Sequence, residues 1–553
     1  MKKSIYNILT LGVIYIGMLA PSSCTKLESE SYGNIVAKDF IPTNEDIGAL
    51  IGSAYSSWRR VLWDGGRAYW TVQEETADAF CRARKPYGFY DGGIHQLLHL
   101  HTWTNEDEAW GAVWTYAYEG VTNCNRLLFQ FESGQIPMPP GPDRDRTIAE
   151  IRTLRASYYY VLCDVFGNVP LVTDYDVPAG FLPEQSTRLQ VYNFIVKEIT
   201  ESLPALSEDH SAATYARFNN KWAAYGLLAK VYLNAEVWSG SPEWDKCIAA
   251  CDAIINANKG FILEPVQRDA FKEQNQGSNE LIWSVPFDET FTEGHLLMVI
   301  VIPHQVSQTY NLRSVGWGGL ISIPQFISTF HPEDKRLTEG WIYGQVYSSA
   351  GVPLTVNTGT LQGQPMVLVN ELPGIDSTEE VHSYRFFKYD LPFGSDPYNM
   401  NHDVPMIRYA DILMMKAECL MRLGQPGAGA LVTEVRKRSF ANPALATVAD
   451  AQLTGTSSYD YGLRDITSGP FGGITHETAP IQYGRFLDEL GWEFCGEARR
   501  RTDMIRFGIY NRKSRLSYRA HPDGSQDYRN IAPIPLSALN SNTKLKQNPG
   551  YVN

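Results

Sequence analysis

Amphipathic helical patterns in four regions of the sequence constrain the fold more than any other feature. Apolar residues recur there at spacings of three and four, as they do on the buried face of a helix. Two of the regions contain a turn rich in glycine and proline, near Gly240 and Gly424, and each therefore predicts two consecutive helices. The four regions span residues 110–128, 151–161, 222–255 and 407–438. The sequence thus predicts a mainly α-helical chain.

The helical pairs resemble tetratricopeptide units, because small residues stand at the expected crossing points and bulky residues stand beside them. Such pairs bury their apolar faces only by stacking on neighbouring pairs. A chain of 553 residues with 44% hydrophobic residues can bury a large core of this kind. No fixed repeat period is visible in the sequence, so periodicity alone leaves a generic helical domain open.

Two long regions lack this periodicity and predict irregular structure. Residues 261–403 contain three short β-like runs among glycine, proline, serine and asparagine, and residues 440–480 have a similar composition. The runs are Leu281–Phe287, Leu296–Ile302 and Tyr384–Lys388. Long loops on a rigid scaffold often carry the functional residues. We therefore expect a helical scaffold with a large loop-rich insert region that contains short β-strands.

The first residues have the features of a lipoprotein signal peptide. Two lysines precede an apolar run from Ile5 to Ala20, which is too short to span a bilayer comfortably, and small residues then lead to Cys24. This pattern predicts that residues 1–23 are removed and that Cys24 carries a lipid. Pro21 departs from the usual pattern, in which an aliphatic residue stands three places before the cysteine. An ordinary signal peptide with a chance cysteine is the alternative.

The charge balance argues against nucleic acid as a partner. The chain has a formal net charge of −13 at pH 7, and loss of the two lysines in residues 1–23 lowers it to −15. Acidic proteins are repelled by phosphate backbones and by anionic lipid surfaces. We therefore expect a membrane attachment through the N-terminal lipid alone.

The remaining cysteines predict buried free thiols. Most of them stand inside apolar helical patterns, and their odd number argues against a complete disulfide framework. Cys247 and Cys251 have the spacing of a helical pair, but no second Cys or His pair stands nearby to complete a zinc site. The seven residues are Cys81, Cys124, Cys163, Cys247, Cys251, Cys419 and Cys495.

Four segments of the sequence carry distinctive motifs. The C-terminal one comprises Asn530–Pro535 (NIAPIP) and Lys544–Tyr551 (KLKQNPGY), and the others are Glu493–Gly508 (EFCGEARRRTDMIRFG), Ile407–Gly424 and Leu154–Leu171. Together these segments resemble the SusD/RagB family of glycan-binding outer-membrane lipoproteins. The C-terminal segment is the most specific, because the family closes with a similar "PIP … L.QNPGY" signature, and Glu493–Gly508 is similar to the family's "E…EG.RR.DL.RFG" motif, with Ala498 where glycine is usual. With the signal peptide, the similarity extends over essentially the whole chain.

This resemblance implies a single domain over residues 24–553, with four tetratricopeptide-like pairs and a loop-rich half that carries the ligand site. The ligand-binding excursions are expected at about 60–105 and 261–403. Members of the family sit on the outer face of Bacteroidetes-type outer membranes, where they act as a lid over a TonB-dependent transporter. They capture oligosaccharides for import, and they carry out no chemistry and need no cofactor. The helical half is expected to face the transporter.

The charged residues of the Arg-rich motif have a structural interpretation. They stand three and four residues apart, a spacing that favours ion pairs along a helix. A buried arginine is tolerated only when its donors are paired. We therefore predict an internal ion-pair network, and not a ligand site, for Glu493, Glu497, Arg500, Arg501, Asp503 and Arg506.

Two loop segments supply candidate glycan contacts. Sugars bind to flat aromatic faces, and planar polar side chains beside them reach the ring hydroxyls. The first segment resembles a family stretch in which a tryptophan stands where this chain has Phe89, so its stacking surface is smaller. In the second, neighbouring glycines are expected to leave Trp317 exposed. The candidates are Arg84, Tyr87, Phe89, Tyr90, Asp91 and Trp103 in the first region, and Tyr310, Arg313 and Trp317 in the second.

Three histidines form the only metal-like spacing in the sequence. On a helix His95 and His99 share a face, whereas on a strand His99 and His101 do. Neither geometry brings all three together, and no adjacent carboxylate motif completes a site. We therefore predict no bound metal and interpret them as partly exposed histidines beside the binding loop.

Two other classes of function remain open at this stage. A surface glycoside hydrolase needs two carboxylates on opposite sides of a sugar, but Glu74 and Asp78 lie four apart on one predicted helix, next to Glu75. Two carboxylates on the same face of one helix are badly placed to reach a glycosidic bond from opposite sides. The other alternative is an interaction scaffold in which the helical repeats bind a peptide and no sugar.

Overall fold

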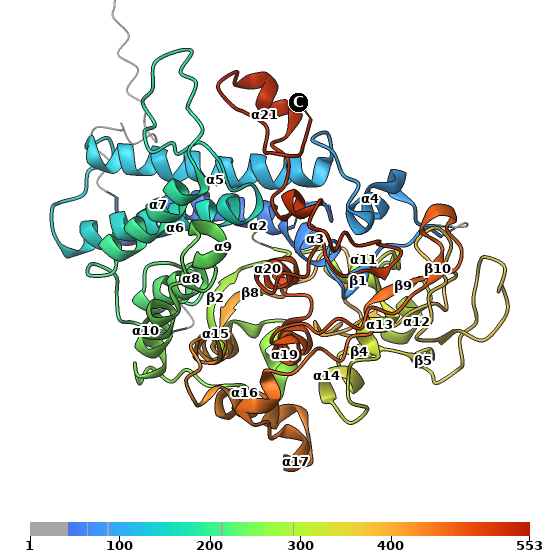
Figure 1. Cartoon of the computed structure of the whole chain (residues 1–553). Coiled ribbons are helices and arrows are strands. Elements are labelled where there is room, and N and C mark those ends of the chain that lie inside the picture. Colours follow the sequence, from blue (N-terminus) through green and yellow to red (C-terminus); the bar gives the residue numbers. More distant parts are fainter. Residues whose placement is uncertain are drawn as a thin grey trace, which may run out of the picture.

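The computed structural model describes residues 42–63, 65–85, 88–211, 214–290, 292 and 294–552. The predicted signal peptide, the lipidation residue Cys24 and the candidate contact Tyr87 lie outside the described residues. Long helices form one side of the molecule, and short strands, short helices and loops form the other side (Figure 1). We refer to these two parts as the helical half and the loop-rich half.

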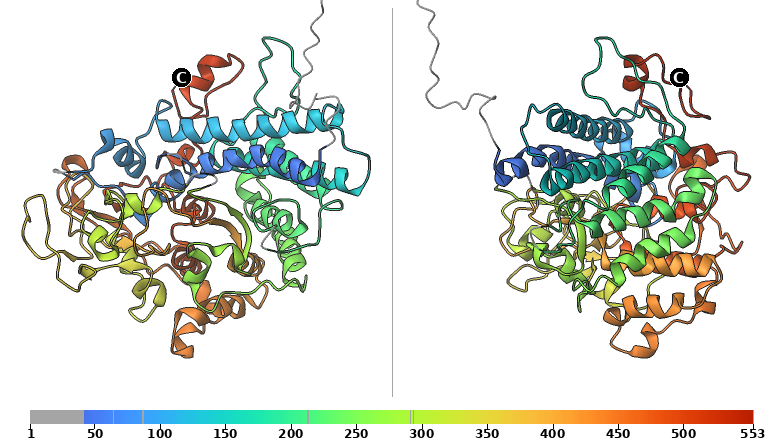
Figure 2. Two further views of the ribbon diagram at one scale, coloured as in Figure 1. Left: turned by 180° about the vertical axis from the view of Figure 1, so that it is seen from behind. Right: turned by 90° about the vertical axis from the view of Figure 1, so that its left-hand side faces the viewer.

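The helical half is a stack of helices that follow the chain order. Its members are α2 (Asn44–Leu62), α5 (Glu108–Glu132), α6 (Pro142–Val165), α7 (Arg188–Ser202), α8 (Lys221–Leu233), α10 (Trp244–Ile255), α15 (Tyr409–Arg422) and α16 (Ala428–Arg436). Successive members pack on one another, as α5 does on α6, α8 on α10, and α15 on α16. The right-hand view of Figure 2 shows this order, from cyan α5 at the top to orange α16 at the bottom. The predicted tetratricopeptide-like scaffold is therefore confirmed.

Glycines allow the helices to approach their neighbours closely at two places. A Cβ atom at Gly120 of α5 would lie 2.3 Å from the ring of Tyr158 on α6. A Cβ atom at Gly226 of α8 would lie 2.7 Å from Cγ2 of Ile407, which belongs to a strand. Real Cβ atoms do not come this close to other atoms, so a larger residue at either place would force the packed elements apart. These contacts explain why small residues stand beside bulky ones in the helical patterns.

The loop-rich half is held together by pairs of short strands, two of which join segments far apart in sequence. Antiparallel pairs join β1 (Phe80–Cys81) to β3 (Ile321–Ser322), β2 (Leu281–Val285) to β8 (Val404–Arg408), β4 (Trp341–Ile342) to β7 (Arg385–Phe386), and β5 (Gly344–Gln345) to β6 (Val367–Leu368). The strand β9 (Gly462–Asp465) pairs with β10 (Gly473–Ile474) and, in parallel, with β11 (Arg515–Leu516). Because β1 and β2 pair with strands that follow much later in the chain, this half does not form an independent unit.

Short helices connect these strands and the long helices. They are α3 (Tyr69–Glu74), α4 (Ile94–Leu100), α9 (Ala235–Ser239), α11 (Leu297–Val301), α12 (Val306–Tyr310), α13 (Pro324–Ile327), α14 (Lys335–Thr338), α17 (Pro443–Ala446), α18 (Asp450–Leu453), α19 (Gly484–Phe494), α20 (Arg500–Arg506) and α21 (Leu536–Ser541). The left-hand view of Figure 2 shows α21 and the C-terminus beside the long helices of the first third of the chain.

Two of the predicted elements need correction. The run Leu296–Ile302 is not a strand, because Leu297–Val301 forms the short helix α11 with all of its residues buried. A short, continuously apolar run has no periodicity that distinguishes a strand from a buried helix. The helix predicted from Ile407 begins later, at Tyr409, because Ile407 and Arg408 end strand β8. The predicted strands at Leu281–Phe287 and Tyr384–Lys388 are present as β2 and β7.

The four segments that carry the family resemblance form one interlocked buried unit. Arg408 donates to Glu493 and Glu497, and Arg501 donates to Asp164 of α6. Asn548 donates through its side-chain nitrogen to the backbone oxygens of Phe166 and Ala532, at 2.8 Å in both cases. The prediction of an ion-pair network is confirmed, but most of its partners come from distant segments and only Asp503 pairs within its own helix.

The cysteines in the described ranges agree with the sequence prediction. All seven are free and buried, and burial raises the pKa of thiols such as Cys81 and Cys124. None of the helices in these ranges combines the length and the apolar character that a bilayer-spanning segment needs.

Candidate functional site

The two loop segments chosen from the sequence lie against each other in the structure. Lys85 donates from Nζ to the backbone oxygen of Gly318 at 2.6 Å, and its second partner is Glu380 at 2.7 Å. The half-buried ring of Phe89 covers Gly319, where a Cβ atom would lie 3.0 Å from the ring. Burial lowers the pKa of Lys85, and its carboxylate partner opposes that shift. Segments separated by more than two hundred residues thus form one surface.

Glycines hold Trp317 at the surface, as the sequence predicts. A Cβ atom at Gly316 would lie 2.1 Å from the backbone oxygen of Ile302, so no other residue fits there without moving the loop. The backbone nitrogen of Trp317 donates to the oxygen of Val299 at 2.6 Å. With its backbone fixed in this way, the Trp317 side chain points outward and is 40% exposed.

A third segment, which the sequence did not single out, completes this surface. Trp317 donates from Nε1 to the hydroxyl oxygen of Tyr398 at 2.6 Å, and the two rings meet edge to face with centroids 5.5 Å apart. Tyr398 is 37% exposed. The backbone nitrogen of Arg313 donates to the oxygen of Ser395, which joins the two loops. We call Trp317 and Tyr398 the aromatic pair.

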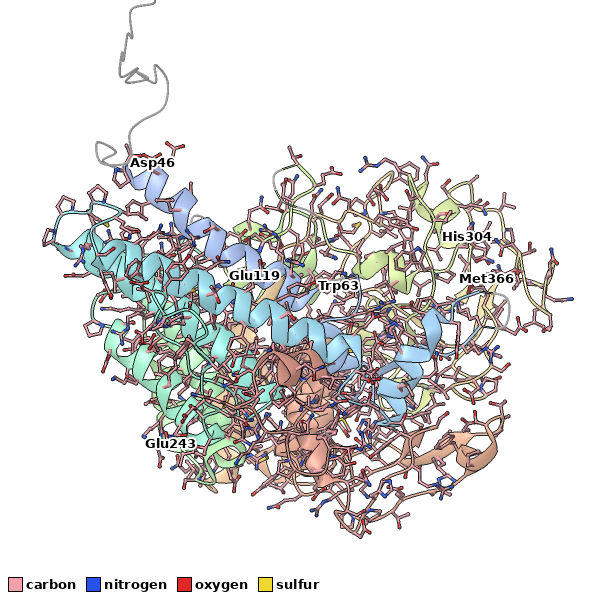
Figure 3. The ribbon with its side chains drawn as sticks, turned by 90° about the horizontal axis from the view of Figure 1, so that it is seen from above. Asp46, Trp63, Glu119, Glu243, His304 and Met366 are labelled. Atoms are coloured by element: carbon pink, nitrogen blue, oxygen red, sulfur yellow. The ribbon has the colours of Figure 1, made fainter. Side chains whose placement is uncertain are left out.

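An open cleft of about 600 Å³ begins at the aromatic pair and extends to the end of helix α2. Figure 3 shows Trp63 where α2 meets the loop-rich half, and Glu119 on the adjacent helix α5. Asn399 accepts from the backbone nitrogen of Gly294 at 2.5 Å, which fixes the wall opposite α2. The lining residues are Ser56, Arg59, Arg60, Trp63, Gly65, Phe287, Thr292, Gly294, Leu296, Tyr398 and Asn399. We call this space the α2 cleft.

The first loop segment offers a second exposed aromatic ring. Tyr90 is 46% exposed, and the guanidinium carbon of Arg84 lies 5.0 Å from its ring centroid. Asp91 receives a hydrogen bond from Arg67 at 2.7 Å and lies 3.2 Å from Nε2 of His95. The hydrogen bond with His95 and the nearby Arg67 guanidinium hold the pKa of Asp91 below its usual range. Asp91 therefore orders this loop as a carboxylate.

The structure corrects the expectation for Trp103. This residue is only 2% exposed, and its indole nitrogen donates to the hydroxyl of Tyr551 at 3.0 Å. Its ring also packs edge to face on Trp110. A tryptophan enclosed in this way has no free face for a sugar, so Trp103 is a core residue that anchors the C-terminus.

The other two candidates of the second segment have supporting positions. Tyr310 is half-buried against Phe387, with ring centroids 5.5 Å apart. Arg313 is exposed and forms an ion pair with Glu289 at 3.1 Å. Both belong to the surface around the aromatic pair, but neither lines the α2 cleft.

The acids considered for a hydrolase are buried inside the protein. Glu74, Glu75 and Asp78 are each 0% exposed. Asp78 pairs with Arg500 through both of its oxygens, and Glu75 pairs with Arg82 at 2.6 Å. Glycoside hydrolysis needs two carboxyl groups that reach the sugar from opposite sides. These three acids do not face the α2 cleft, so they cannot serve as such a pair.

The three histidines are buried, so the prediction that they are partly exposed is wrong, and His95 and His101 have separate partners. His95 contacts Glu75 and Asp91, whereas His101 contacts Asn511 and the backbone oxygen of Thr76. His99 is fully buried, and burial lowers its pKa to about 3. Within the described residues, no group of three or more His, Cys, Asp or Glu side chains could hold a metal ion.

Two family models match the chain. The model of the SusD family matches residues 322–551, and a model described as starch-binding associating with outer membrane matches residues 87–233. Together they match well over half of the sequence. Among characterised proteins, the chain is 23% identical to the starch-binding protein SusD of Bacteroides thetaiotaomicron, over 79% of this chain and 78% of that protein. It is 25% identical to a SusD-like protein of Formosa agariphila, over 79% of both chains.

Solved structures show the same fold. A laminarin-binding SusD-like protein aligns with a TM-score of 0.67 and 21% identity, over 92% of this chain and 100% of that one. Surface glycan-binding protein A of Bacteroides thetaiotaomicron, solved with laminarihexaose, aligns with a TM-score of 0.67 and 18% identity over the same shares.

The stacked helices and the loop-built aromatic surface define a binding protein on a tetratricopeptide-like scaffold, and the relatives are named for binding and not for catalysis. The chain belongs to the SusD/RagB family.

Proposed function

We propose that this chain is a cell-surface glycan-binding lipoprotein, anchored to the outer membrane through Cys24, that captures oligosaccharides without cleaving them. The observation that carries the proposal is the aromatic pair, which two adjoining loops hold at the surface beside an open cleft. An exposed indole and an exposed phenol give flat apolar faces for sugar C–H groups, and the cleft supplies hydrogen-bonding groups for the hydroxyls.

The proposed glycan contacts are Trp317 and Tyr398, with Tyr90, Phe89 and Arg84 at the edge of the same surface. Arg313, Tyr310 and Asp91 position these loops through the contacts described above. The starch and laminarin named for the relatives support an oligosaccharide as the class of ligand. The family model that describes association with the outer membrane supports the location.

We further propose that the protein passes its ligand to a TonB-dependent transporter. Residues 24–553 then act as one domain, in which the helical half faces the transporter and the excursions at about 60–105 and 261–403 face the glycan. The family resemblance supports this arrangement.

Affinity electrophoresis in gels that contain polysaccharides from a panel tests glycan binding. Alanine at Trp317 together with Phe89 should abolish retention, because both stacking faces are lost. Tyr175→Ala is the matched control, since Tyr175 is 43% exposed but lies on the helical half. Co-purification with the transporter should be unchanged in the double variant. Retention that survives the double substitution would show that these loops are not the site.

Assays for released reducing ends separate binding from hydrolysis. The protein incubated with a polysaccharide that it retains should produce no new reducing ends, because the acids considered for catalysis are buried and paired. Sustained turnover would contradict the proposal.

A further inference from the structure

The described lining of the α2 cleft is positively charged, although the chain as a whole is acidic. Arg59 and Arg60 line it, and none of its described lining residues is an aspartate or glutamate. Asp64 and Glu293, which neighbour lining residues in sequence, lie outside the described residues. A protein with a net charge of −13 does not collect anions over its whole surface, so an anion that binds must be held locally.

Trp63, which lines this cleft, carries an unsatisfied hydrogen-bond donor. Its side chain is 9% exposed, and its indole Nε1 is buried without a hydrogen-bond partner in the described part of the structure. Buried polar groups are almost always paired, so each exception calls for an explanation. An acceptor on a ligand in the cleft would satisfy this N–H group, and an indole nitrogen can only donate.

The aromatic pair and its neighbour also have donors left for a ligand. The hydroxyl of Tyr398 already accepts from Trp317, so its own hydrogen remains to be donated. Asn399 uses its side-chain oxygen to accept from Gly294, which leaves the amide –NH₂ as its remaining hydrogen-bonding capacity. The cleft thus presents donors from both of its walls.

Arg60 is held in place but remains open to a stronger partner. Its Nη1 lies 3.1 Å from Oε2 of Glu119, and the two side chains are 51% and 41% exposed. Its guanidinium carbon lies 3.9 Å from the ring centroid of Tyr116, which orders the side chain. Exposed ion pairs contribute little, because water screens them. A carboxylate or sulfate in the cleft can therefore engage Arg60 at small cost.

We propose that the α2 cleft is a subsite for the anionic substituent, a carboxylate or a sulfate ester, of an acidic glycan. This inference rests on the proposed glycan-binding function and adds the class of ligand. The sugar ring stacks at the aromatic pair, and its anionic group accepts hydrogen bonds from Trp63, Arg60 and Asn399. Charge-assisted hydrogen bonds of this kind are stronger than those between neutral groups.

Isothermal titration calorimetry with matched oligosaccharide pairs tests the proposal. One pair is tetragalacturonate and its carboxyl-reduced form, and the other is a sulfated dextran oligosaccharide and its unsulfated parent. The two pairs distinguish a carboxylate from a sulfate ligand. The wild-type chain should bind the anionic member of at least one pair at least tenfold more tightly than the neutral member.

Four variants test which residues produce the preference for the anionic oligosaccharide. Arg60→Gln should remove the preference for the anionic member, and Trp63→Phe should weaken it several-fold, with melting curves confirming that both variants are folded. Glu119→Gln should strengthen the preference, because it frees Arg60 from its competitor. Arg512→Gln is the matched control, since Arg512 is 50% exposed and pairs with Asp527 away from the cleft. It should leave the preference unchanged.

The outcomes separate this inference from the proposed function. Equal binding of both members in each pair, or an anionic preference that survives Arg60→Gln, would overturn the inference while glycan binding stands. So would binding of neutral polysaccharides from the panel with no binding of either anionic probe. Failure to bind any glycan would overturn the inference and the proposed function together.

Discussion

Replacing Arg408 by methionine should unfold the protein more readily than any exposed substitution. Arg408 is 0% exposed and donates five side-chain hydrogen bonds, to the carboxylates of Glu280, Glu493 and Glu497 and to the backbone oxygen of Glu493. Methionine fills a similar volume but pairs with none of these groups. The substitution therefore leaves a cluster of buried carboxylates with one cation fewer.

The remaining cations offset part of the loss in the free energy of unfolding. Glu280 keeps Arg438 and Glu497 keeps Lys388, while Glu493 keeps both Arg438 and Arg336. Breaking a buried ion pair by removing one partner costs about 3–5 kcal/mol. Because Arg408 bridges three carboxylates, we expect a loss near the upper end of that range. Nearby cations hold the pKa of Glu493 below its usual range, so losing Arg408 should raise that pKa.

Urea unfolding at pH 7 measures the loss as a shift of the midpoint at constant slope. Arg408→Lys should lie between wild type and Arg408→Met, because an ammonium group keeps the charge but not the fork of donors. The exposed pair variant Arg512→Gln should change the free energy of unfolding by less than about 0.5 kcal/mol. A loss below about 1 kcal/mol in Arg408→Met would refute the view that this cluster depends on Arg408.

Three further outcomes follow from the geometry. Gly316→Ala should weaken glycan binding at least tenfold in calorimetry, because the new Cβ atom would displace the loop that presents Trp317; full affinity would contradict this account. Burial raises the pKa of Glu74 to about 7, above its unfolded value. Glu74 therefore contributes fully to the free energy of unfolding below about pH 4.5, and this contribution should be lost as the pH rises through 7. This loss amounts to about 3 kcal/mol and should shrink in Glu74→Gln, as thermal melts over pH 5–8 will report. The buried cysteines should not react with a thiol reagent until the chain unfolds, and rapid labelling of the native protein would contradict their burial.

Elements with strong periodicity could be predicted from the sequence, because the pattern itself records which face is buried. The stripe at 110–128 lies within α5, and the pattern before the Gly424 turn corresponds to α15, which begins two residues later than predicted. The strand predicted for the apolar run Leu296–Ile302 is wrong, because Leu297–Val301 are all buried and their sequence shows no alternation of apolar and polar residues.

The binding surface could be predicted only in part, because contacts between distant loops leave no local signal. The glycines around Trp317 gave a physical reason for its exposure, and the structure agrees. Trp103 follows a loop in the same way, but its partner Tyr551 stands 448 residues later and encloses it. The sequence does not single out Tyr398, because its neighbours carry no pattern that marks a binding residue. Its hydrogen bond with Trp317, 81 residues earlier, places it in the site.

The attachment of the C-terminal segment to the first third of the chain constrains the order in which the native contacts can form. Asn548 donates to the backbone oxygen of Phe166, 382 residues earlier, and Tyr551 accepts a hydrogen bond from Trp103, 448 residues earlier. Contacts of such long range form late, since the intervening chain must first be brought together. While residues 548–551 are still to be synthesised, the emerging chain lacks these contacts, although nearly all of its core is already present. Deletion of residues 548–553 should therefore yield a protein that proteases degrade more rapidly than the wild type.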